Sequence, residues 1–313
     1  MQDCLEEGRL SDKKFGSTRR GIAPVYGDKY MKKAIRMGEL FDMKALKERL
    51  ADILEWKNLT LCNVYGGEPV SLNGMTEHLK RYGEQLLPFI TDVGLYLTEA
   101  EKAGKKIMFE AQLGALRDID FGIYPYTSSS NAIAAYAPVG AGVPNLKLDL
   151  SIGIMKAYST CVGEGPFTAE YFGDKAEDLR KAGGEYGAAT GRPRRVGPFD
   201  AVASKYGIRI QGADEIALTK LDVLSYAKEI EVCVAYEKDG KQTTDFPFPQ
   251  HLDSYKPVLK TVKGWNCDIS GCRKKEDLPK EAREYIEFLE ASIGAKIKYV
   301  SVGAEREAYI VMY

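Results

Sequence analysis

Three arginines within four positions, Arg192, Arg194 and Arg195, are the residues of this sequence whose types and spacing most clearly suggest chemistry. Guanidinium groups bind carboxylates and phosphates through two parallel hydrogen bonds, a geometry that a lysine ammonium does not reproduce. The glycines Gly183 and Gly184 precede them and give the backbone freedom to fold over an anion. The segment predicts either an anion-binding loop or a solvated basic loop, and the arginines alone do not decide between them.

A second candidate site follows the apolar run that ends at Thr219. Asp222 places a carboxylate at the predicted strand end, where its oxygens can accept both N–H donors on the edge of a guanine base. The stem of Lys220 can pack on the same base, and residues 301–303 can offer it backbone contacts. The spacing Thr-Lys-x-Asp is therefore a guanine-binding hypothesis, although four residues alone match many unrelated sequences.

Two further segments place polar groups on predicted loops. Residues 18–24 offer a hydroxyl, two guanidinium groups and backbone N–H donors, which together suggest a phosphate cradle. Residues 110–114 and 124–131 combine amide, carboxylate and hydroxyl groups, as a hydrogen-bonded small-molecule pocket requires. Serine and asparagine also serve as caps and turn residues, so local capping is the alternative interpretation.

Hydrophobic periodicity predicts the elements that must position these groups. Helical spacing indicates helices over 42–56, over 75–104 with an interruption near Pro88, and near 175–182, 198–205 and 279–292. Short apolar runs indicate strands at 106–109, 149–157, 215–219, 229–236, 295–300 and 308–313. This alternation is typical of an α/β fold with a largely parallel central sheet and flanking helices. Because no repeat or low-complexity linker interrupts the chain, we expect a single domain over residues 1–313.

Composition narrows the possible partners. A net charge of −1 over 313 residues gives no general attraction to nucleic acid or to a membrane surface. No apolar run approaches the length of a membrane span, and the first residues lack the apolar core of a signal peptide. The six cysteines are scattered without a disulfide framework or zinc-binding spacing. We therefore expect a cytoplasmic protein that binds neither nucleic acid nor membranes.

Taken in order, these segments resemble the adenylosuccinate synthetase family, whose members use GTP to join IMP to L-aspartate in AMP biosynthesis. The resemblance begins near Ser17 and rests on the motifs STRRGIAPVYGDK, EAQLGALRDIDFGIYPYTSSSN, KAYSTCVGEGPF, TGRPRRVGPFDAVA, LTKLDVL and KYVSVGAER. It implies a nucleotide-binding architecture similar to that of GTPases, the substrates IMP, GTP and L-aspartate, Mg²⁺ as the cofactor, and a homodimer.

The resemblance also implies roles for individual residues. The loop that contains Arg192 and Arg194 would close over aspartate, with Arg192 contacting aspartate and IMP and Arg194 facing GTP. Thr18 would contact the IMP phosphate, and Lys32 would reach the IMP site of the neighbouring subunit. The implied IMP-binding residues are Thr18, Lys32, Gln112, Ser128, Val162 and Arg192. The implied aspartate-binding residues are Ala188, Ala189, Thr190, Gly191, Arg192, Pro193 and Arg194. The implied GTP-binding residues are Arg194, Lys220, Leu221, Asp222, Ser301, Val302 and Gly303.

The sequence departs from the family pattern at several of these positions. Lys32 and Cys161 stand where the family has arginine, and Ser128 and Ala189 stand where it has threonine. Gln112 is shifted by one place relative to the family motif Glu-Gly-Ala-Gln-Gly. Lysine keeps the charge but loses the bidentate fork, and serine keeps the hydroxyl. We expect these changes to weaken affinity or to mark a divergent branch rather than to change the reaction.

The largest departure concerns the phosphate loop. Family members carry a first strand followed by a loop of the type Gly-Asp-Glu-Gly-Lys-Gly-Lys, whose aspartate is the general base. A histidine that stabilises phosphoryl transfer follows shortly afterwards, and Mg²⁺ binds in the same region. None of these motifs occurs in this sequence, which corresponds to roughly the C-terminal three-quarters of the family pattern. We therefore expect an N-terminally truncated domain with no catalytic residue or metal ligand of its own.

Three interpretations of the chain stay open at this stage. It is either a truncated copy of the enzyme, one part of a split enzyme, or a non-catalytic nucleotide-binding or dimerisation module. In each case we expect the isolated chain to make no adenylosuccinate, because the residues that handle the triphosphate are not among its 313 residues.

Overall fold

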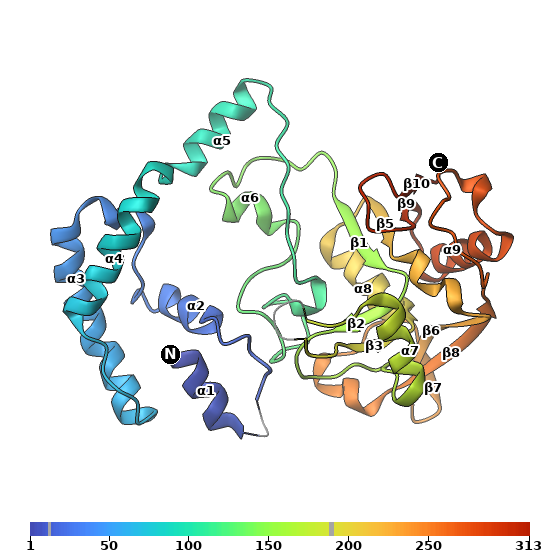
Figure 1. Cartoon of the computed structure of the whole chain (residues 1–313), viewed down its shortest axis with the longest axis horizontal. Helices are drawn as coiled ribbons and strands as arrows, with labels where there is room; N and C mark the ends of the chain where they lie inside the picture. The colour runs from blue at the N-terminus through green and yellow to red at the C-terminus, as the bar shows by residue number, and fades with distance from the viewer. Residues whose placement is uncertain (12–13, 188–190) are drawn as a thin grey trace. The chain divides into compact units, whose positions relative to one another are not determined.

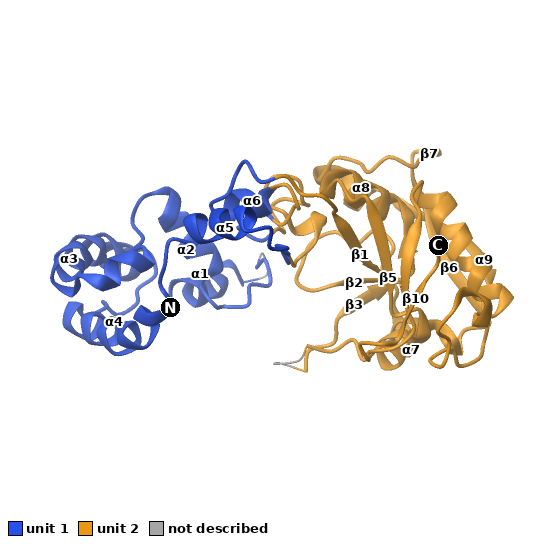
Figure 2. Ribbon diagram, turned by 90° about the horizontal axis from the view of Figure 1, so that it is seen from above, with its two compact units in different colours: residues 1–110, 128–131, 136–146 blue, residues 111–127, 132–135, 147–313 orange. Residues whose placement is uncertain are grey.

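The computed structural model describes residues 1–11, 14–187 and 191–313, whose elements are labelled in Figure 1. The chain divides into two compact units, which Figure 2 shows in different colours. Unit 1 comprises Met1–Glu110, Ser128–Asn131 and Tyr136–Leu146, and unit 2 comprises Ala111–Thr127, Ala132–Ala135 and Lys147–Tyr313.

Unit 1 consists of helices and their connections in the residues that are described. The helices are α1 (Gln2–Leu10), α2 (Ile22–Tyr30), η2 (Met37–Phe41), α3 (Met43–Leu59), η3 (Thr60–Val64), α4 (Leu72–Leu86), η4 (Leu87–Phe89), α5 (Val93–Lys102) and α6 (Tyr136–Gly140). Leucines at helical spacing in α3 are buried, which confirms the helix predicted over 42–56. Pro88 separates α4 from α5, as predicted, because proline cannot donate the N–H that continues a helix.

The strand predicted over 106–109 is wrong. This segment pairs with no strand among the described residues, and the Met108 side chain is strongly exposed. A β-strand needs hydrogen-bonded neighbours and a covered face, and the described part of unit 1 provides helices only. A run of four residues was too short for its apolar character to predict a strand.

Unit 2 contains the strands that the structure describes. They are β1 (Ile152–Lys156), β2 (Ser159–Cys161), β3 (Arg195–Gly197), β4 (Phe199–Asp200), β5 (Glu215–Thr219), β6 (Glu229–Lys238), β7 (Lys241–Thr243), β8 (Lys256–Lys263), β9 (Ile297–Ser301) and β10 (Tyr309–Val311). Its helices are η5 (Ala115–Arg117), α7 (Gly173–Gly183), α8 (Ala201–Gln211), η6 (Leu221–Tyr226), η7 (Pro249–Ser254), η8 (Lys275–Asp277) and α9 (Lys280–Ile293). Apart from the segment at 106–109, the predicted strands are confirmed, as are the three helices predicted between residues 175 and 292.

The central sheet has the strand order β1-β5-β9-β10. Strands β1 and β9 both run parallel to β5, and β10 runs antiparallel to β9. Lys156 at the end of β1 pairs with Thr219 at the end of β5. The carboxyl ends of β1, β5 and β9 therefore lie at the same edge of the sheet. This arrangement confirms the predicted α/β fold with a largely parallel sheet, and it brings segments that are distant in sequence to one edge.

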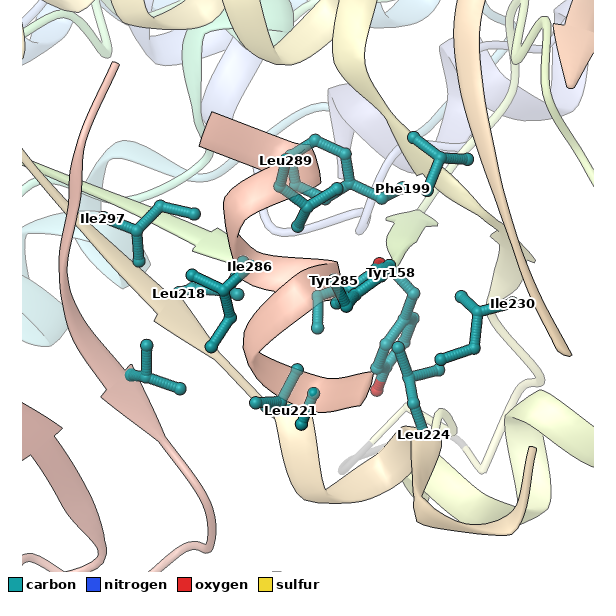
Figure 3. Close-up of a cluster of buried hydrophobic side chains, with 14 of the residues drawn as sticks. Tyr158, Phe199, Leu218, Leu221, Leu224, Ile230, Tyr285, Ile286, Leu289 and Ile297 are labelled. Atoms are coloured by element: carbon teal, nitrogen blue, oxygen red, sulfur yellow. The ribbon is translucent and has the colours of Figure 1, made fainter. Parts of the chain in front are cut away.

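The main hydrophobic core of unit 2 joins this sheet to α9, as Figure 3 shows. Leu218 of β5 and Ile297 of β9 are buried among Tyr285, Ile286 and Leu289, which lie on one face of α9. Burial of each of these aliphatic side chains contributes about 1.5–3 kcal/mol. The core therefore holds the sheet edge that carries the candidate site residues.

Two further sheets complete unit 2. Strand β6 pairs antiparallel with β7 and β8 and parallel with β4. Strands β2 and β3 form an antiparallel ribbon in which Cys161 lies opposite Arg195. The sequence did not predict β2 and β3, because strands of three residues carry no readable periodicity. This ribbon places the turn after β2 beside the arginine-rich segment.

Replacing Gly197 by alanine is expected to destabilise unit 2 by about 1–3 kcal/mol, because overpacking forces the backbone to shift. A Cβ atom at Gly197 would overlap the carbonyl oxygen of Ala169. This oxygen is a backbone atom, so it cannot move away by a side-chain rotation. Gly271→Ala is the matched control, since a Cβ atom there meets nothing within 4 Å. Urea unfolding of both variants measures the difference, and equal unfolding midpoints would contradict the expectation.

Candidate functional site

The predicted guanine-binding residues lie at the carboxyl ends of two neighbouring strands. Residues 220–222 directly follow β5, and residues 301–303 lie at the end of β9. Since β5 and β9 pair in parallel, these ends meet at one edge of the sheet, where η6 contacts β9. The structure thus brings the two predicted segments together, although about eighty residues of sequence separate them.

The turn after β5 presents Asp222 at this edge. Lys220 has a left-handed backbone with φ 60° and caps η6, so the chain changes direction directly after the strand. Leu221 is fully buried and anchors the turn, whereas Asp222 is half-buried. Burial raises the pKa of Asp222, an effect that the charge of Lys220 opposes and that of Asp268 reinforces. A half-buried carboxylate with this surrounding can accept two N–H donors from a planar base.

The segment after β9 is held by its own hydrogen bonds. Ser301 Oγ donates to the carbonyl oxygen of Gly303 at 2.9 Å. The N–H of Val302 donates to the carbonyl oxygen of Ala308 at 2.9 Å, and the Val302 side chain is buried. The backbone beside Asp222 is therefore ordered by the protein itself, so a base bound against it would cost little additional loop ordering.

A buried carboxylate, that of Glu185, links the guanine candidates to the arginine-rich segment. Its Oε1 accepts hydrogen bonds from Tyr158 Oη at 2.6 Å and from the Nζ atoms of Lys156 and Lys220, both at 2.9 Å. Its Oε2 accepts from Arg194 Nη1 at 2.7 Å. The side chain of Glu185 has no exposed surface, so all of its charge is balanced by these protein groups.

The pKa of Glu185 reflects this environment. Burial raises the pKa, but the hydrogen bonds from Tyr158 and the cationic groups outweigh burial and lower the pKa to about 2. The same burial lowers the pKa of Lys156 and raises the pKa of the Tyr158 hydroxyl. Glu185 is therefore an anion at every pH at which the protein is expected to work, and it serves as a fixed acceptor rather than as a proton carrier.

Backbone hydrogen bonds close the base of the arginine-rich segment into a neck. The N–H of Arg194 donates to the carbonyl oxygen of Glu185 at 2.9 Å, and the N–H of Gly187 donates to that of Arg192 at 2.8 Å. Tyr186 and Pro193 form an antiparallel bridge between these two hydrogen bonds. Ala188, Ala189 and Thr190, three of the predicted aspartate-binding residues, lie outside the described residues.

The turn after β2 lies beside this neck. Arg192, which is largely exposed, forms an ion pair with Glu164 of the turn at 3.4 Å. Val162 is exposed, and its carbonyl oxygen accepts from Arg117 Nη2 at 2.9 Å. Arg117 Nη2 also donates to the sulfur of Cys161 at 2.7 Å. The structure therefore places the predicted residues Val162 and Arg192 on adjoining segments of unit 2.

Arg195 differs from the two other arginines of the cluster. Its guanidinium binds both carboxylate oxygens of Glu170 and donates to the carbonyl oxygen of Gly165 at 2.7 Å. The hydrogen bonds that Arg195 donates to Glu170 raise the pKa of Arg195. Two carboxylate oxygens and a carbonyl oxygen of the protein occupy this guanidinium. We therefore keep the anion-binding hypothesis for Arg192 and Arg194, whose contacts to Glu164 and Glu185 are each made through one nitrogen. The Nε atom of Arg194 is buried and has no hydrogen-bond partner in the described part of the chain.

The remaining predicted IMP-binding residues lie in both units. Gln112 belongs to unit 2 and is exposed on the segment before η5. Ser128, Thr18 and Lys32 belong to unit 1, where Thr18 and Lys32 are exposed and Ser128 is half-buried. The hydroxyl groups of Ser128 and Ser130 lie 2.9 Å apart within hydrogen-bonding distance.

The predicted phosphate cradle at 18–24 is partly occupied by a carboxylate that sequence reasoning missed. Asp3 of α1 is buried and accepts from Ser17 Oγ and from the N–H of Gly21, each at 2.7 Å. These hydrogen bonds fix the turn that displays Thr18, and they remove the Gly21 N–H from the donors that the cradle can offer to a ligand.

Sequence reasoning also missed the most connected residue of the site, Glu185. The position of Glu185, between the glycine pair 183–184 and the arginine cluster, could have indicated that it balances the charge of a nearby arginine. Its other partners come from β1, the segment after β1 and the end of β5, and only strand pairing brings them to it. Within the described residues, no group of three or more histidine, cysteine, aspartate or glutamate side chains is placed to hold a metal ion. No described helix is long and apolar enough to cross a membrane.

A largely parallel sheet whose strand ends carry a half-buried carboxylate beside an arginine-bearing loop neck is typical of nucleotide-binding proteins of the α/β class. The sequence matches the family described as adenylosuccinate synthetase over residues 1–310. The chain therefore belongs to the adenylosuccinate synthetase family, which comprises GTP-dependent ligases of purine biosynthesis.

Individual relatives agree with this assignment. Adenylosuccinate synthetase of Kineococcus radiotolerans is 43% identical over 312 residues, which cover 99% of this chain and 73% of the relative. That of Synechococcus elongatus is 43% identical over 311 residues, with coverage of 99% and 70%. The structure of fully ligated adenylosuccinate synthetase from Plasmodium falciparum superimposes with a TM-score of 0.93 at 33% identity, covering 100% of this chain and 74% of that chain.

Proposed function

We propose that this chain supplies the IMP, L-aspartate and guanine contacts of an adenylosuccinate synthetase. The observation that supports this most directly is the meeting of Asp222 and residues 301–303 at the ends of two parallel strands. By the family resemblance, Asp222 and residues 301–303 are positions that contact the guanine base. The neighbouring neck carries Arg194 and Arg192, for which the resemblance implies contacts to GTP and to aspartate with IMP.

The proposed reaction has two steps. The γ-phosphoryl group of GTP is transferred to O6 of IMP, which loses its N1 proton, and GDP is released. The amino nitrogen of aspartate then attacks C6, and inorganic phosphate leaves to give adenylosuccinate. Positive groups around the transferred phosphoryl group and the leaving phosphate supply most of the stabilisation in such reactions. Arg192 and Arg194 are the groups of this chain that we assign to that role.

The individual assignments follow the predicted positions. IMP is bound by Thr18, Lys32, Gln112, Ser128, Val162 and Arg192. Aspartate is bound by residues 188–194, and the guanine nucleotide by Arg194, Lys220, Leu221, Asp222, Ser301, Val302 and Gly303. Exposed side chains at Thr18, Lys32 and Gln112 are available for such contacts.

These 313 residues contain neither a phosphate loop of the family type nor a Gly-x-x-x-x-Gly-Lys-Ser/Thr motif. We therefore propose that the general base, the stabilising histidine and the Mg²⁺ ligands come from sequence outside these residues, and we assign no step to the metal here. We further propose a homodimer, in which Lys32 reaches the partner's IMP site. We also propose a cytoplasmic location, since all six cysteines are free thiols.

A polypeptide of these 313 residues, given IMP, GTP, aspartate and Mg²⁺, is expected to bind the nucleotides and to form no adenylosuccinate. Binding is measured by calorimetry, and product by chromatography. Addition in trans of the phosphate-loop segment of a relative is expected to restore product formation, because it returns the groups that handle the triphosphate. Arg192→Ala is expected to abolish the restored activity.

The outcomes separate the interpretations. Product formed by the purified chain alone, and lost in Arg192→Ala, would contradict the proposed need for outside residues. Binding without product even in the presence of the added segment supports a non-catalytic nucleotide-binding module instead. Failure to bind either IMP or GTP at millimolar concentration would contradict the proposed function as a whole.

A further inference from the structure

We infer that Glu185 is a positioning residue that couples the guanine-binding lysine, Lys220, to the neck of the arginine-rich loop. The inference rests on the proposed function, because that function assigns Lys220 to guanine and Arg194 to the GTP side of the aspartate loop. The side chain of Glu185 is fully buried and is bound by protein groups, so we assign its effect to the two cations that it orients.

The coupling follows from how the two oxygens of one carboxylate are divided. Oε1 accepts from Lys220 Nζ at 2.9 Å, and Oε2 accepts from Arg194 Nη1 at 2.7 Å. A carboxylate is rigid and planar, so a movement of one cation displaces the acceptor of the other. Lys220 Nζ also donates to the carbonyl oxygen of Gly183 at 2.6 Å, two residues before Glu185. The lysine that is proposed to pack on guanine is thereby attached directly to the chain that enters the neck.

Backbone contacts make the neck depend on Glu185 a second time. Its carbonyl oxygen accepts the N–H of Arg194 at 2.9 Å, while Arg180 Nε donates to the carbonyl oxygen of Arg194 at 2.8 Å. The Arg194 backbone and its side chain are thus both held by the same residue. An altered side-chain position at Glu185 is therefore transmitted to the strand of the neck that carries Arg192.

Charge balance explains why the neutral amide cannot replace this carboxylate. Three cations, Lys156, Lys220 and Arg194, surround the single anion. Tyr158 contributes a fourth hydrogen bond without charge. Removal of the negative charge leaves three cations close together in a partly buried cluster, where their repulsion is poorly screened. Lys220 and Arg194 would then separate, and the guanine site and the neck would no longer be connected through a shared acceptor.

Coupling of this kind is reciprocal, because two ligands that favour the same arrangement strengthen each other's binding. Binding of GTP, which engages Lys220, is expected to stabilise the neck hydrogen bonds of Gly187 and Arg194. Hydrogen–deuterium exchange of these backbone amides, measured with and without saturating GTP, reads out the effect. In the unmodified chain we expect GTP to slow this exchange about tenfold, within the usual range of coupling between sites.

In Glu185→Gln, GTP affinity is expected to fall about tenfold, because Lys220 loses the charge-assisted hydrogen bond that holds it in position for GTP. At saturating GTP, the effect of GTP on exchange in the neck is expected to fall below about twofold. Glu170→Gln is the matched control, because Glu170 pairs with the adjacent Arg195 and makes no hydrogen bond to Lys220. It should retain the full GTP effect. A merely structural role of Glu185 would alter stability without removing the response of the neck to GTP.

Retention of the full GTP effect in Glu185→Gln would overturn the inference. It would also be overturned if the unmodified chain bound GTP but the exchange of the Gly187 and Arg194 amides did not change. An unmodified chain that does not bind GTP would overturn the proposed guanine site and the inference with it. Glu185→Asp serves as a second variant if Glu185→Gln does not fold. It keeps the negative charge but shortens the side chain by one methylene, so the carboxylate cannot hold Lys220 and Arg194 at their present positions together. It is expected to reduce the GTP effect by about half or more, and an unchanged effect would contradict the coupling.

Discussion

Asp222→Asn is expected to weaken GTP binding by about a hundredfold or more. The carboxylate of Asp222 is proposed to accept the N1–H and the N2 amino group of guanine, and each charge-assisted hydrogen bond contributes roughly 1.5–3 kcal/mol. Asparagine loses the charge and turns an N–H donor towards one of these donors, so the second hydrogen bond becomes a repulsive contact. Calorimetric titration with GTP measures the loss.

Xanthosine triphosphate distinguishes this explanation from misfolding. Xanthine carries a carbonyl oxygen where guanine carries the N2 amino group, and the asparagine amide can donate to it. Asp222→Asn should therefore bind XTP more tightly than GTP, in reverse of the unmodified chain. Asp268→Asn is the control, because Asp268 lies close enough to influence Asp222 electrostatically but bonds to Ser270. Equal GTP affinity in Asp222→Asn and the unmodified chain would exclude Asp222 from the guanine site.

Asp200→Ala is expected to lower the free energy of unfolding by about 2–4 kcal/mol at neutral pH. Asp200 is 4% exposed and accepts from Tyr236 Oη at 2.6 Å and, as the N-cap of α8, from the N–H of Ala203 at 3.0 Å. Loss of a helix cap costs about 1 kcal/mol, and a buried hydroxyl left without its acceptor costs about 1–3 kcal/mol. Urea unfolding measures the change. In a Tyr236→Phe background the cost should be smaller, since the hydroxyl is already absent.

The pH dependence of the same group has a defined sign. Burial raises the pKa of Asp200 to about 6, above that of an unfolded chain. The folded state therefore binds this proton more tightly, so the contribution of Asp200 to stability is largest below about pH 4 and declines as the pH rises to 6. Asp200→Asn should remove this decline. Glu185, whose pKa is lowered to about 2, acts in the opposite direction and only in more acidic solution, below its unfolded pKa.

Asp277→Ala provides the comparison for this prediction. Asp277 also accepts backbone N–H groups, those of Arg273 and Lys274, but it is exposed. These hydrogen bonds lower its pKa, so its contribution declines with falling rather than rising pH. Its replacement should cost less than that of Asp200 and should leave the decline between pH 4 and 6 intact. Loss of that decline in Asp277→Ala but not in Asp200→Asn would contradict the assignment to Asp200.

The sequence by itself determined the elements whose apolar residues repeat regularly. The helical spacing of α9 and the short apolar runs of β5 and β9 were predicted because burial selects apolar side chains at those positions. The family was recognised for a similar reason, since long motifs keep chemically specific residues at set spacings. The strand at 106–109 was predicted wrongly because a short apolar run does not specify which neighbour will cover it.

The tertiary structure alone decided which charged groups meet. Glu185 binds Lys156, Tyr158 and Lys220 only because β1 and β5 pair in parallel and α7 ends beside them. The fold likewise decided that Arg195 forms an ion pair with Glu170. Arg194 instead forms an ion pair with Glu185, which also binds Lys220, the lysine proposed to contact guanine. Arg194 and Arg195 are adjacent in sequence but have different partners in space. The stability of a buried charge depends on its partners and on how deeply it is buried, and neither can be read from local spacing. The hydrophobic pattern of the sequence therefore predicted the helices and strands, whereas the ion pairs of the site followed only from the packing of the fold.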